Sequence, residues 1–273
     1  AVMTLVTNGA DTRVADPEGN TPLHYAALSR EAAVAAVLVD AAADPAAINR
    51  EGLTPLGVAC AAGNEAVAGL LLERGAQSAP VRAVPALIAA CSGADDLPGL
   101  VKLLIRHKAA VDACDRLGRT ALHAAALHGH AEMADALLAA GAPIDARDAN
   151  GVTATMEAAR AGANRVLQRL LFRKPSIDLV DQGGRSALSI ACASRKAGEE
   201  TVRLLLALGA DPTLAANDGR RPIEHAVAGG RWPVVALLDP DYALPNALHD
   251  PELVEAADSA GSVERGTLLC AAL

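Results

Sequence analysis

The sequence predicts an all-α fold, a solenoid of stacked helix–turn–helix units joined by β-turn fingers, and two observations lead to this prediction. The first is a seven-residue phrase at residues 21–27, which returns in related form at residues 54–60 and 120–126. Weaker copies start at Pro85, Thr153, Ser186 and Arg221. The steps between successive starts are 33, 31, 35, 33, 33 and 35 residues, a period typical of a repeat array. The second is glycine at recurring places between the phrases, where helices end and turns begin.

The first helix of each unit begins inside the phrase. Thr120 is a good N-cap residue, and Leu122 and Ala125 follow it at helical spacing. In a sister copy, Pro22 occupies the first helical position, where proline costs nothing because that N–H has no helical partner. This helix is expected to end near residues 128–129.

The second helix of the same unit is expected to begin near Ala131. It would bury Met133 and Leu137, which lie four residues apart and therefore on one face. Gly141 then ends the helix, because glycine readily enters the left-handed region. The turn before the phrase, residues 115–120, has a glycine where a positive φ is needed.

Several units depart from this pattern. A two-residue deletion falls in residues 77–84, where the turn glycine is absent, and it predicts a notch in the row of fingers. Insertions at residues 94–98 and 196–200 carry paired acids, which we interpret as solvated helix starts rather than a carboxylate site. Lys108 and Lys174 replace the glycine that ends the second helix, so tighter or less regular turns are expected there.

The pattern D-x-x-G-x-T-P-L-H-x-A-A…G-A-D resembles the ankyrin repeat over about residues 1–240. The resemblance implies an ankyrin-repeat solenoid with β-turn fingers, and protein binding on the concave face formed by the fingers and the inner helices. The array is predicted to span residues 1–250, with residues 1–15 as a partial first repeat and residues 251–273 as C-terminal capping helices. Full repeats are expected to start near residues 16, 49, 79, 115, 148, 181 and 216.

Composition narrows the possible functions. The chain has 273 residues, 52% of them hydrophobic but only four aromatic, so its core must be built from Ala, Leu and Val. A net charge of −8 argues against nonspecific binding to nucleic acid, and four aromatic residues are too few for base stacking. No stretch of the sequence is long and apolar enough to cross a bilayer.

Five cysteines are present, and three of them, Cys60, Cys91 and Cys192, each lie six residues after the start of their phrase. They therefore share one predicted buried position, and copies of one position in a stack are too far apart for a disulfide. The chain is thus compatible with a reducing compartment, and a cytoplasmic location is favoured. Because the chain opens within a repeat, its natural N-terminus and any targeting segment are expected upstream of Ala1.

No arrangement of residues indicates catalysis. His128 and His130 are the only closely spaced histidines, and a zinc site would need two further ligands beside them. No nucleophile motif, phosphate-binding loop or dinucleotide-binding fingerprint occurs. We therefore expect no enzyme activity, no metal and no cofactor. His24 and His123 belong to the recurring phrase, and we assign them to helix capping.

The register of the resemblance predicts which positions touch a partner, since finger tips and exposed ends of first helices make most contacts in that family. Arginine recurs at these positions in the C-terminal half, which predicts a basic strip that binds an acidic or phosphorylated segment of another protein. The competing interpretation is that these arginines only keep the solenoid in solution. The predicted partner-binding residues are Arg116, Leu117, Arg119, Leu127, His128, Asn150, Val152, Arg160, Gln182, Arg185, Asn217 and Arg220.

The sequence thus predicts a noncatalytic scaffold for protein–protein interaction. Replacing Arg119, Arg160 and Arg185 by glutamate is expected to weaken partner binding and to leave the thermal melt nearly unchanged. Three alternatives stay open at this point. The chain is the regulatory or localising region of a larger enzyme or membrane protein, or a secreted or periplasmic bacterial protein, or an enzyme in its own right.

Overall fold

The computed structural model describes residues 2–29 and 31–242, and over these ranges the chain forms fifteen helices. They fall into an N-terminal unit, residues 1–149, and a C-terminal unit, residues 150–273. The described ranges hold no β-strand, and their two isolated bridges join Cys114 to Thr120 and Val180 to Ser186. The predicted all-α class is confirmed, while the capping helices predicted for residues 251–273 lie outside the described residues.

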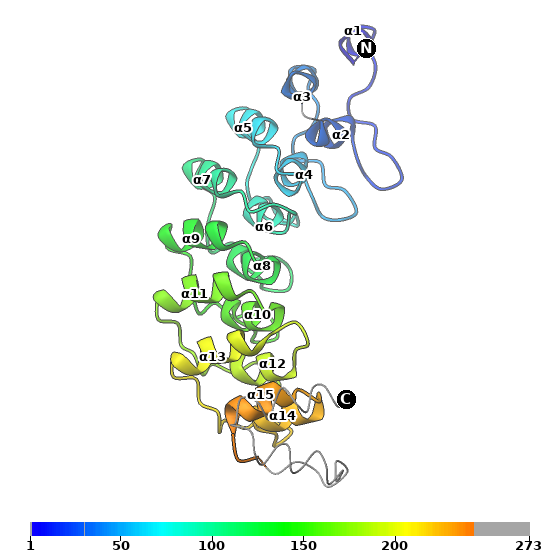
Figure 1. Cartoon of the computed structure of the whole chain (residues 1–273). Coiled ribbons are helices and arrows are strands. Elements are labelled where there is room, and N and C mark those ends of the chain that lie inside the picture. The colour runs from blue at the N-terminus through cyan, green and yellow to red at the C-terminus, as the bar shows by residue number, and fades with distance from the viewer. Residues whose placement is uncertain (1, 30, 243–273) are drawn as a thin grey trace. The chain divides into compact units, whose positions relative to one another are not determined.

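The helices of the N-terminal unit form two layers (Figure 1). The inner helices α2, α4, α6 and α8 pack one on the next, and the outer helices α3, α5, α7 and α9 do the same. Each inner helix also packs on the outer helix that follows it, and α1 packs on α3. The bounds are α1 Val2–Thr7, α2 Pro22–Leu28, α3 Ala32–Asp40, α4 Pro55–Ala61, α5 Glu65–Glu73, α6 Ala86–Cys91, α7 Pro98–Arg106, α8 Ala121–His128 and α9 Ala131–Ala139.

The C-terminal unit repeats this arrangement. Its inner helices α10, α12 and α14 pack in succession, its outer helices α11, α13 and α15 pack beside them, and each inner helix contacts its own outer helix. The bounds are α10 Ala154–Ala161, α11 Asn164–Phe172, α12 Ala187–Ala193, α13 Glu199–Ala207, α14 Pro222–Ala228 and α15 Trp232–Leu238.

Small aliphatic side chains make the core of both units. The leucines of three copies of the phrase, Leu23, Leu56 and Leu122, are each at most 1% exposed. Cys91 and Cys192 are fully buried, and burial raises the pKa of each of these thiols to about 12. Cys60 is 1% exposed, so the predicted shared position of the three cysteines is confirmed as a buried one.

The histidine of the phrase closes the first turn of the inner helix. The backbone N–H of Thr21 donates to Nδ1 of His24 at 3.1 Å, and Nε2 of the same ring lies 3.1 Å from the carbonyl oxygen of Leu53. Burial lowers the pKa of His24, which favours the neutral ring that this geometry needs. In the last copy Glu224 takes this position, and its Oε2 accepts the backbone N–H of Arg221 at 2.6 Å. The capping role is therefore confirmed, and a carboxylate performs it as well.

Outer helices end in a left-handed residue even where glycine is missing. Gly75 and Gly141 have φ values of 85° and 86°, and Lys108 and Lys174 adopt 61° and 53° at the same place. The N–H of Lys108 donates to the carbonyl of Ile105 at 2.9 Å, as a glycine would at this turn. The expectation of a tighter or less regular turn is therefore wrong at Lys108, which keeps both hydrogen bonds of the glycine turn and accepts some backbone strain. Lys174 adopts the same region and keeps the first of these bonds, while Pro175 has no N–H for the second.

At three outer helices, the side chain of the residue just before the helix ties one helix pair to the pair before it. Asn64, His130 and Arg231 hold this position at the starts of α5, α9 and α15. Each has a side-chain nitrogen within hydrogen-bond distance of carbonyl oxygens at or beyond the end of an earlier inner helix, where the last carbonyls of a helix have no N–H donor within that helix. The acceptors are the carbonyls of Ala27 and Ser29, of Gly93, and of Ala191, Cys192 and Ala197.

The first insertion also acts on a neighbour. Both carboxylate oxygens of Asp96 accept backbone N–H groups of α9, from Glu132 and Met133, each at 2.9 Å. Interpreting Asp96 as the solvated start of its own helix was therefore wrong, because it caps the next outer helix instead. In the second insertion Glu199 lies exposed in the first turn of α13, and it pairs with Arg203 at 3.3 Å.

Thr155 occupies a leucine position of the phrase, and its buried hydroxyl has no hydrogen-bond partner in the described part of the chain. Thr155→Val keeps the shape and removes the polar atom, so we expect the free energy of unfolding to rise by about 1 kcal/mol. Chemical denaturation at neutral pH measures this change. Thr153→Val is the control and should destabilise, because its hydroxyl accepts the N–H of Met156. A loss of stability in Thr155→Val would contradict the assignment.

Candidate protein-interaction surface

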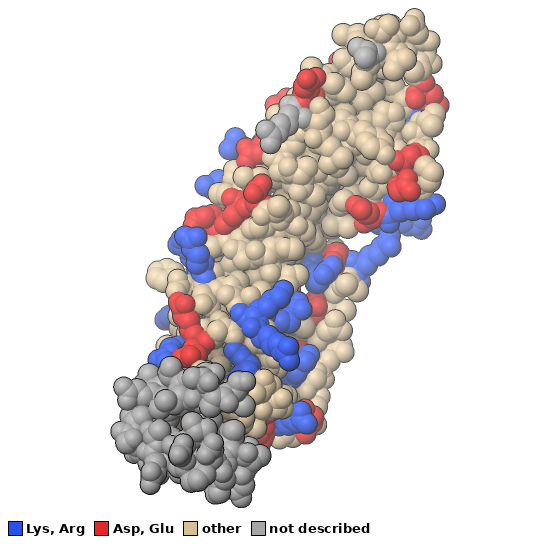
Figure 2. All heavy atoms as spheres, turned by 45° about the vertical axis from the view of Figure 1, so that its right-hand side comes forward, with Lys and Arg blue, Asp and Glu red and all other residues tan. Residues whose placement is uncertain are grey.

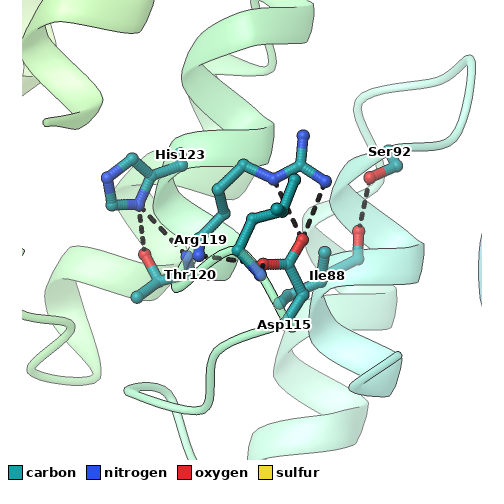
Figure 3. A network of polar contacts seen from close by, with 7 residues as sticks. Ile88, Ser92, Asp115, Arg119, Thr120 and His123 are labelled. Atoms are coloured by element: carbon teal, nitrogen blue, oxygen red, sulfur yellow. Dashed lines mark hydrogen bonds and ion pairs between the residues drawn. The ribbon is translucent and has the colours of Figure 1, made fainter. Parts of the chain in front are cut away.

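An aspartate holds the finger before α8 in shape (Figure 3). Asp115 Oδ1 accepts the backbone N–H groups of Leu117 and Arg119 at 2.8 and 3.0 Å, and Oδ2 accepts two guanidinium N–H groups of Arg119 at 2.9 and 2.7 Å. Burial acts to raise the pKa of this carboxyl, but the hydrogen bonds outweigh it, so its pKa lies below the usual value. Its stabilising effect is therefore present at neutral pH and is lost as the pH falls through that lowered pKa.

The same arrangement recurs in the C-terminal unit. Asp181 accepts the backbone N–H groups of Gly183 and Arg185, both at 2.9 Å, and two guanidinium N–H groups of Arg185 at 2.9 and 2.7 Å. The Asp181 side chain is only 3% exposed, while that of Arg185 is 51% exposed. The finger thus buries its carboxylate and leaves the guanidinium at the surface.

Hydrogen bonds also join neighbouring fingers. In the N-terminal unit the N–H of Arg50 donates to the carbonyl of Glu18 at 2.8 Å. In the C-terminal unit the N–H of Asn217 donates to the carbonyl of Gly183, and its Nδ2 donates to that of Gln182, each at 2.9 Å. Asn217 was predicted to touch a partner, and the structure gives it a part in holding the fingers together as well.

The finger at residues 77–84 differs from the others, as its deletion predicted. Arg82 adopts the left-handed region with a φ of 72°. The N–H of Val84 donates to the carbonyl of Gly52 in the preceding finger at 2.8 Å. The link to the following finger uses a side chain, because the Arg116 guanidinium donates to the Arg82 carbonyl at 3.1 Å.

Two hollows open on the finger side of the N-terminal unit. The larger, about 450 Å³, lies between the first two fingers and the helices α2 and α4, and Leu28, Leu53 and Val58 give it apolar walls. The smaller, about 260 Å³, spans three fingers, including the shortened one, and Arg50 and Glu51 line both hollows. This face therefore combines apolar surface with charged groups around it.

Every predicted partner-binding residue lies in a finger or at the end of an inner helix, and none is fully buried. In the N-terminal unit, Arg116, Leu117 and Arg119 line the smaller hollow together, while Leu127 and His128 end α8. The remaining residues belong to the C-terminal unit. They are Asn150, Val152, Arg160, Gln182, Arg185, Asn217 and Arg220.

Most arginines of the predicted strip already have an acidic partner. Arg119 pairs with Asp115 and Arg185 with Asp181, each at 2.7 Å. Arg160 pairs with Glu157, and Arg220 lies 3.8 Å from Asp218. Figure 2 shows many Lys and Arg side chains gathered on this face, with Asp and Glu side chains beside some of them. The positive charge of these arginines is thus partly offset within the chain.

This pairing changes what the glutamate variants should do. Glutamate in place of Arg119, Arg160 or Arg185 would face a carboxylate that is at most 10% exposed. Two carboxylates so close repel each other, and the first loses its hydrogen-bond donor. The structure therefore predicts that the triple variant has a lower melting temperature than the unaltered chain, whereas the sequence alone predicted a nearly unchanged one.

The contacts of His128 and His130 are those of structural residues. The rings of His128 and His130 stack with their centroids 5.9 Å apart, and burial together with the neighbouring His130 lowers the pKa of His128. Nε2 of His130 lies 2.9 Å from the carbonyl oxygen of Gly93. Among residues 2–29 and 31–242, no three His, Cys, Asp or Glu residues come together as a metal site would require.

The predicted partner-binding residues do not include two arginines that line the smaller hollow, Arg50 and Arg82. The prediction concentrated on the C-terminal half, and Arg82 lies in the finger whose register the deletion disturbs. The sequence does contain a feature that separates paired from unpaired arginines. Arg119 and Arg185 each follow an aspartate by four residues, whereas Arg50 and Arg82 follow Ala46 and Ser78.

Comparison with known proteins agrees with this architecture. Three copies of the model for ankyrin repeats match residues 1–80, 86–181 and 155–247, so they cover most of the chain. The chain belongs to the ankyrin repeat family, whose members generally act as protein–protein interaction modules. No curated protein matches the chain. In the part of the chain that the structure describes, no helix has the length and apolar character needed to span a membrane.

Proposed function

We propose that this chain is a noncatalytic scaffold that binds another protein on the concave face formed by its fingers and inner helices. The observation that carries the proposal is the pair of hollows in the N-terminal unit, where apolar walls meet charged residues. Protein–protein interfaces typically combine an apolar centre with a polar rim, and the two hollows offer both.

Exposed leucines on this face support the proposal. Leu28, at the end of α2, is 58% exposed, and Leu117, at a finger tip, is 51% exposed. Burying the exposed half of a leucine against a partner stabilises a complex by about 1 kcal/mol, so each can act as an anchor. The two leucines line different hollows, which extends the proposed contact over several fingers.

The double variant Leu28→Ser/Leu117→Ser tests the proposal. Both side chains are exposed, so the fold should be unaffected, whereas the affinity for a partner should fall about thirtyfold, since two losses of about 1 kcal/mol each add up. The chain and the variant are immobilised, and the proteins that each retains from an extract of the native organism are quantified by mass spectrometry. Supporting evidence is a protein retained by the chain and depleted by the variant.

A matched control removes two exposed apolar side chains elsewhere. Phe172 and Leu208, at the ends of the outer helices α11 and α13, are 86% and 41% exposed. Phe172→Ser/Leu208→Ser should retain the partner as the unaltered chain does. Equal retention by all three proteins, equal loss by both variants, or the absence of any specific partner would contradict the proposal.

A further inference from the structure

The smaller hollow carries arginines that the chain does not neutralise. Arg50 and Arg82 form no ion pair with any acid in the described residues, and both side chains are exposed. Arg116, beside them, donates to the Arg82 carbonyl, which leaves its charge uncompensated. Only the fourth arginine of the hollow, Arg119, is paired, with Asp115.

We propose that this hollow, at the shortened finger, binds a phosphorylated side chain of the protein partner, held by Arg50, Arg82 and Arg116. The inference rests on the proposed function, since it assigns the chemistry of one group on that partner. It shares only Arg116 with the predicted basic strip, because it selects arginines that have no acidic partner in the described residues and that lie within the N-terminal unit.

The charge of the hollow favours phosphate over carboxylate. Four arginines and two acids, Glu51 and Asp115, line it, which leaves a net charge of +2. A phosphorylated side chain carries a charge of about −2 at neutral pH and three oxygens that accept hydrogen bonds. A carboxylate offers half that charge and only two oxygens. Three guanidinium groups therefore match a phosphate better in both charge and number of acceptors.

The shortened finger makes room for this group and orients its arginines. The deletion removes finger residues between Gly52 and Arg116, and the 260 Å³ hollow opens there. The bond from Arg116 to the Arg82 carbonyl uses one of the five N–H groups of that guanidinium, and four remain to donate elsewhere. This bond also fixes the Arg116 guanidinium beside the backbone of Arg82 in the neighbouring finger.

The backbone conformation of Arg82 is unusual for a residue that has a side chain. Its φ of 72° is one that glycine adopts without strain, as Gly52 and Gly118 do at φ values of 79° and 74° in the adjacent fingers. A side chain in this region strains the backbone. Lys108 and Lys174 accept similar strain at helix ends, so what sets Arg82 apart is that its side chain lines the hollow and has no acidic partner in the described residues.

Titration with O-phospho-L-serine tests the proposal on the full chain. Arginine side-chain NMR signals report binding, and we expect the Arg50, Arg82 and Arg116 signals to shift in a saturable way. Arg50→Gln/Arg82→Gln should weaken this binding about tenfold or more, since each charge-assisted hydrogen bond lost contributes strongly. Lys102→Gln/Arg106→Gln is the matched control, with the same change in net charge on the exposed side of α7, and should bind as the unaltered chain does.

Three outcomes would overturn the proposal. They are the absence of saturable shifts, equal binding by the Arg50→Gln/Arg82→Gln variant, and binding of L-aspartate as tight as that of O-phospho-L-serine, which would assign the hollow to a carboxylate. Failure here is separable from failure of the scaffold proposal. A partner that depends on Leu28 and Leu117 but binds without any phosphoserine effect contradicts only the phosphate site.

Discussion

Replacing Arg231 by methionine is expected to lower the free energy of unfolding of the C-terminal unit by about 3 kcal/mol. The guanidinium is partly buried and donates to three carbonyl oxygens, those of Ala191, Cys192 and Ala197. Methionine retains much of the aliphatic stem but no donor, so these carbonyls lose a charged partner at the end of α12. A hydrogen bond to a charged group contributes about 1.5–3 kcal/mol, and more than one is lost here.

Urea denaturation followed by tryptophan fluorescence measures this effect directly. Trp232 is the single tryptophan of the chain and adjoins Arg231 at the start of α15. The control is Arg203→Met, which removes an exposed ion pair with Glu199 and should cost less than about 0.5 kcal/mol. Equal losses in the two variants would show that Arg231 does not stabilise the stack through these carbonyls.

Asp181→Asn is expected to lower the free energy of unfolding by about 2 kcal/mol. The carboxylate is 3% exposed and accepts two backbone N–H groups of its finger and two N–H groups of Arg185. Asparagine has one acceptor oxygen in place of two, and its amide N–H groups would face donors. The loss of charge-assisted hydrogen bonds from a buried acceptor explains the size of the effect.

An exposed finger aspartate provides the control for this variant. Asp218 is 51% exposed, accepts the N–H of Arg220 at 3.0 Å, and lies 3.8 Å from that guanidinium. Asp218→Asn should therefore change the free energy of unfolding by less than about 0.5 kcal/mol. Chemical denaturation of both variants decides the matter, and a loss for Asp218→Asn as large as for Asp181→Asn would refute this account of the fingers.

The sequence predicted those parts of the fold that depend on local pattern. Thr120 as a cap, the helix end at His128, and the common burial of Cys60 and Cys91 all follow from residues within one repeat. Local pattern also predicted that the finger at residues 77–84 differs from the others, because a deletion shows in the sequence as a shortened step between two copies of the phrase. The boundaries between the repeats stay a prediction.

Contacts between repeats could not be predicted in this way. Asp96 caps a helix that begins 35 residues later in the chain, and Arg231 donates to carbonyls of another helix pair. The choice of partner in such contacts depends on how far one helix pair is displaced from the next. The internal pairing of Arg119 and Arg185 was visible as an aspartate four residues earlier, but that spacing was not used to predict it.

The proposed scaffold binds its partner on the finger side of the inner helices. Site-specific photocrosslinking tests it most directly, with a benzophenone amino acid placed in turn at Leu28, Leu117, Phe172 and Leu208, all of them exposed. We expect the captured partner to crosslink from Leu28 and Leu117 and not from the outer-helix positions Phe172 and Leu208. Crosslinks from the outer-helix positions, with none from the two leucines on the finger side, would contradict it.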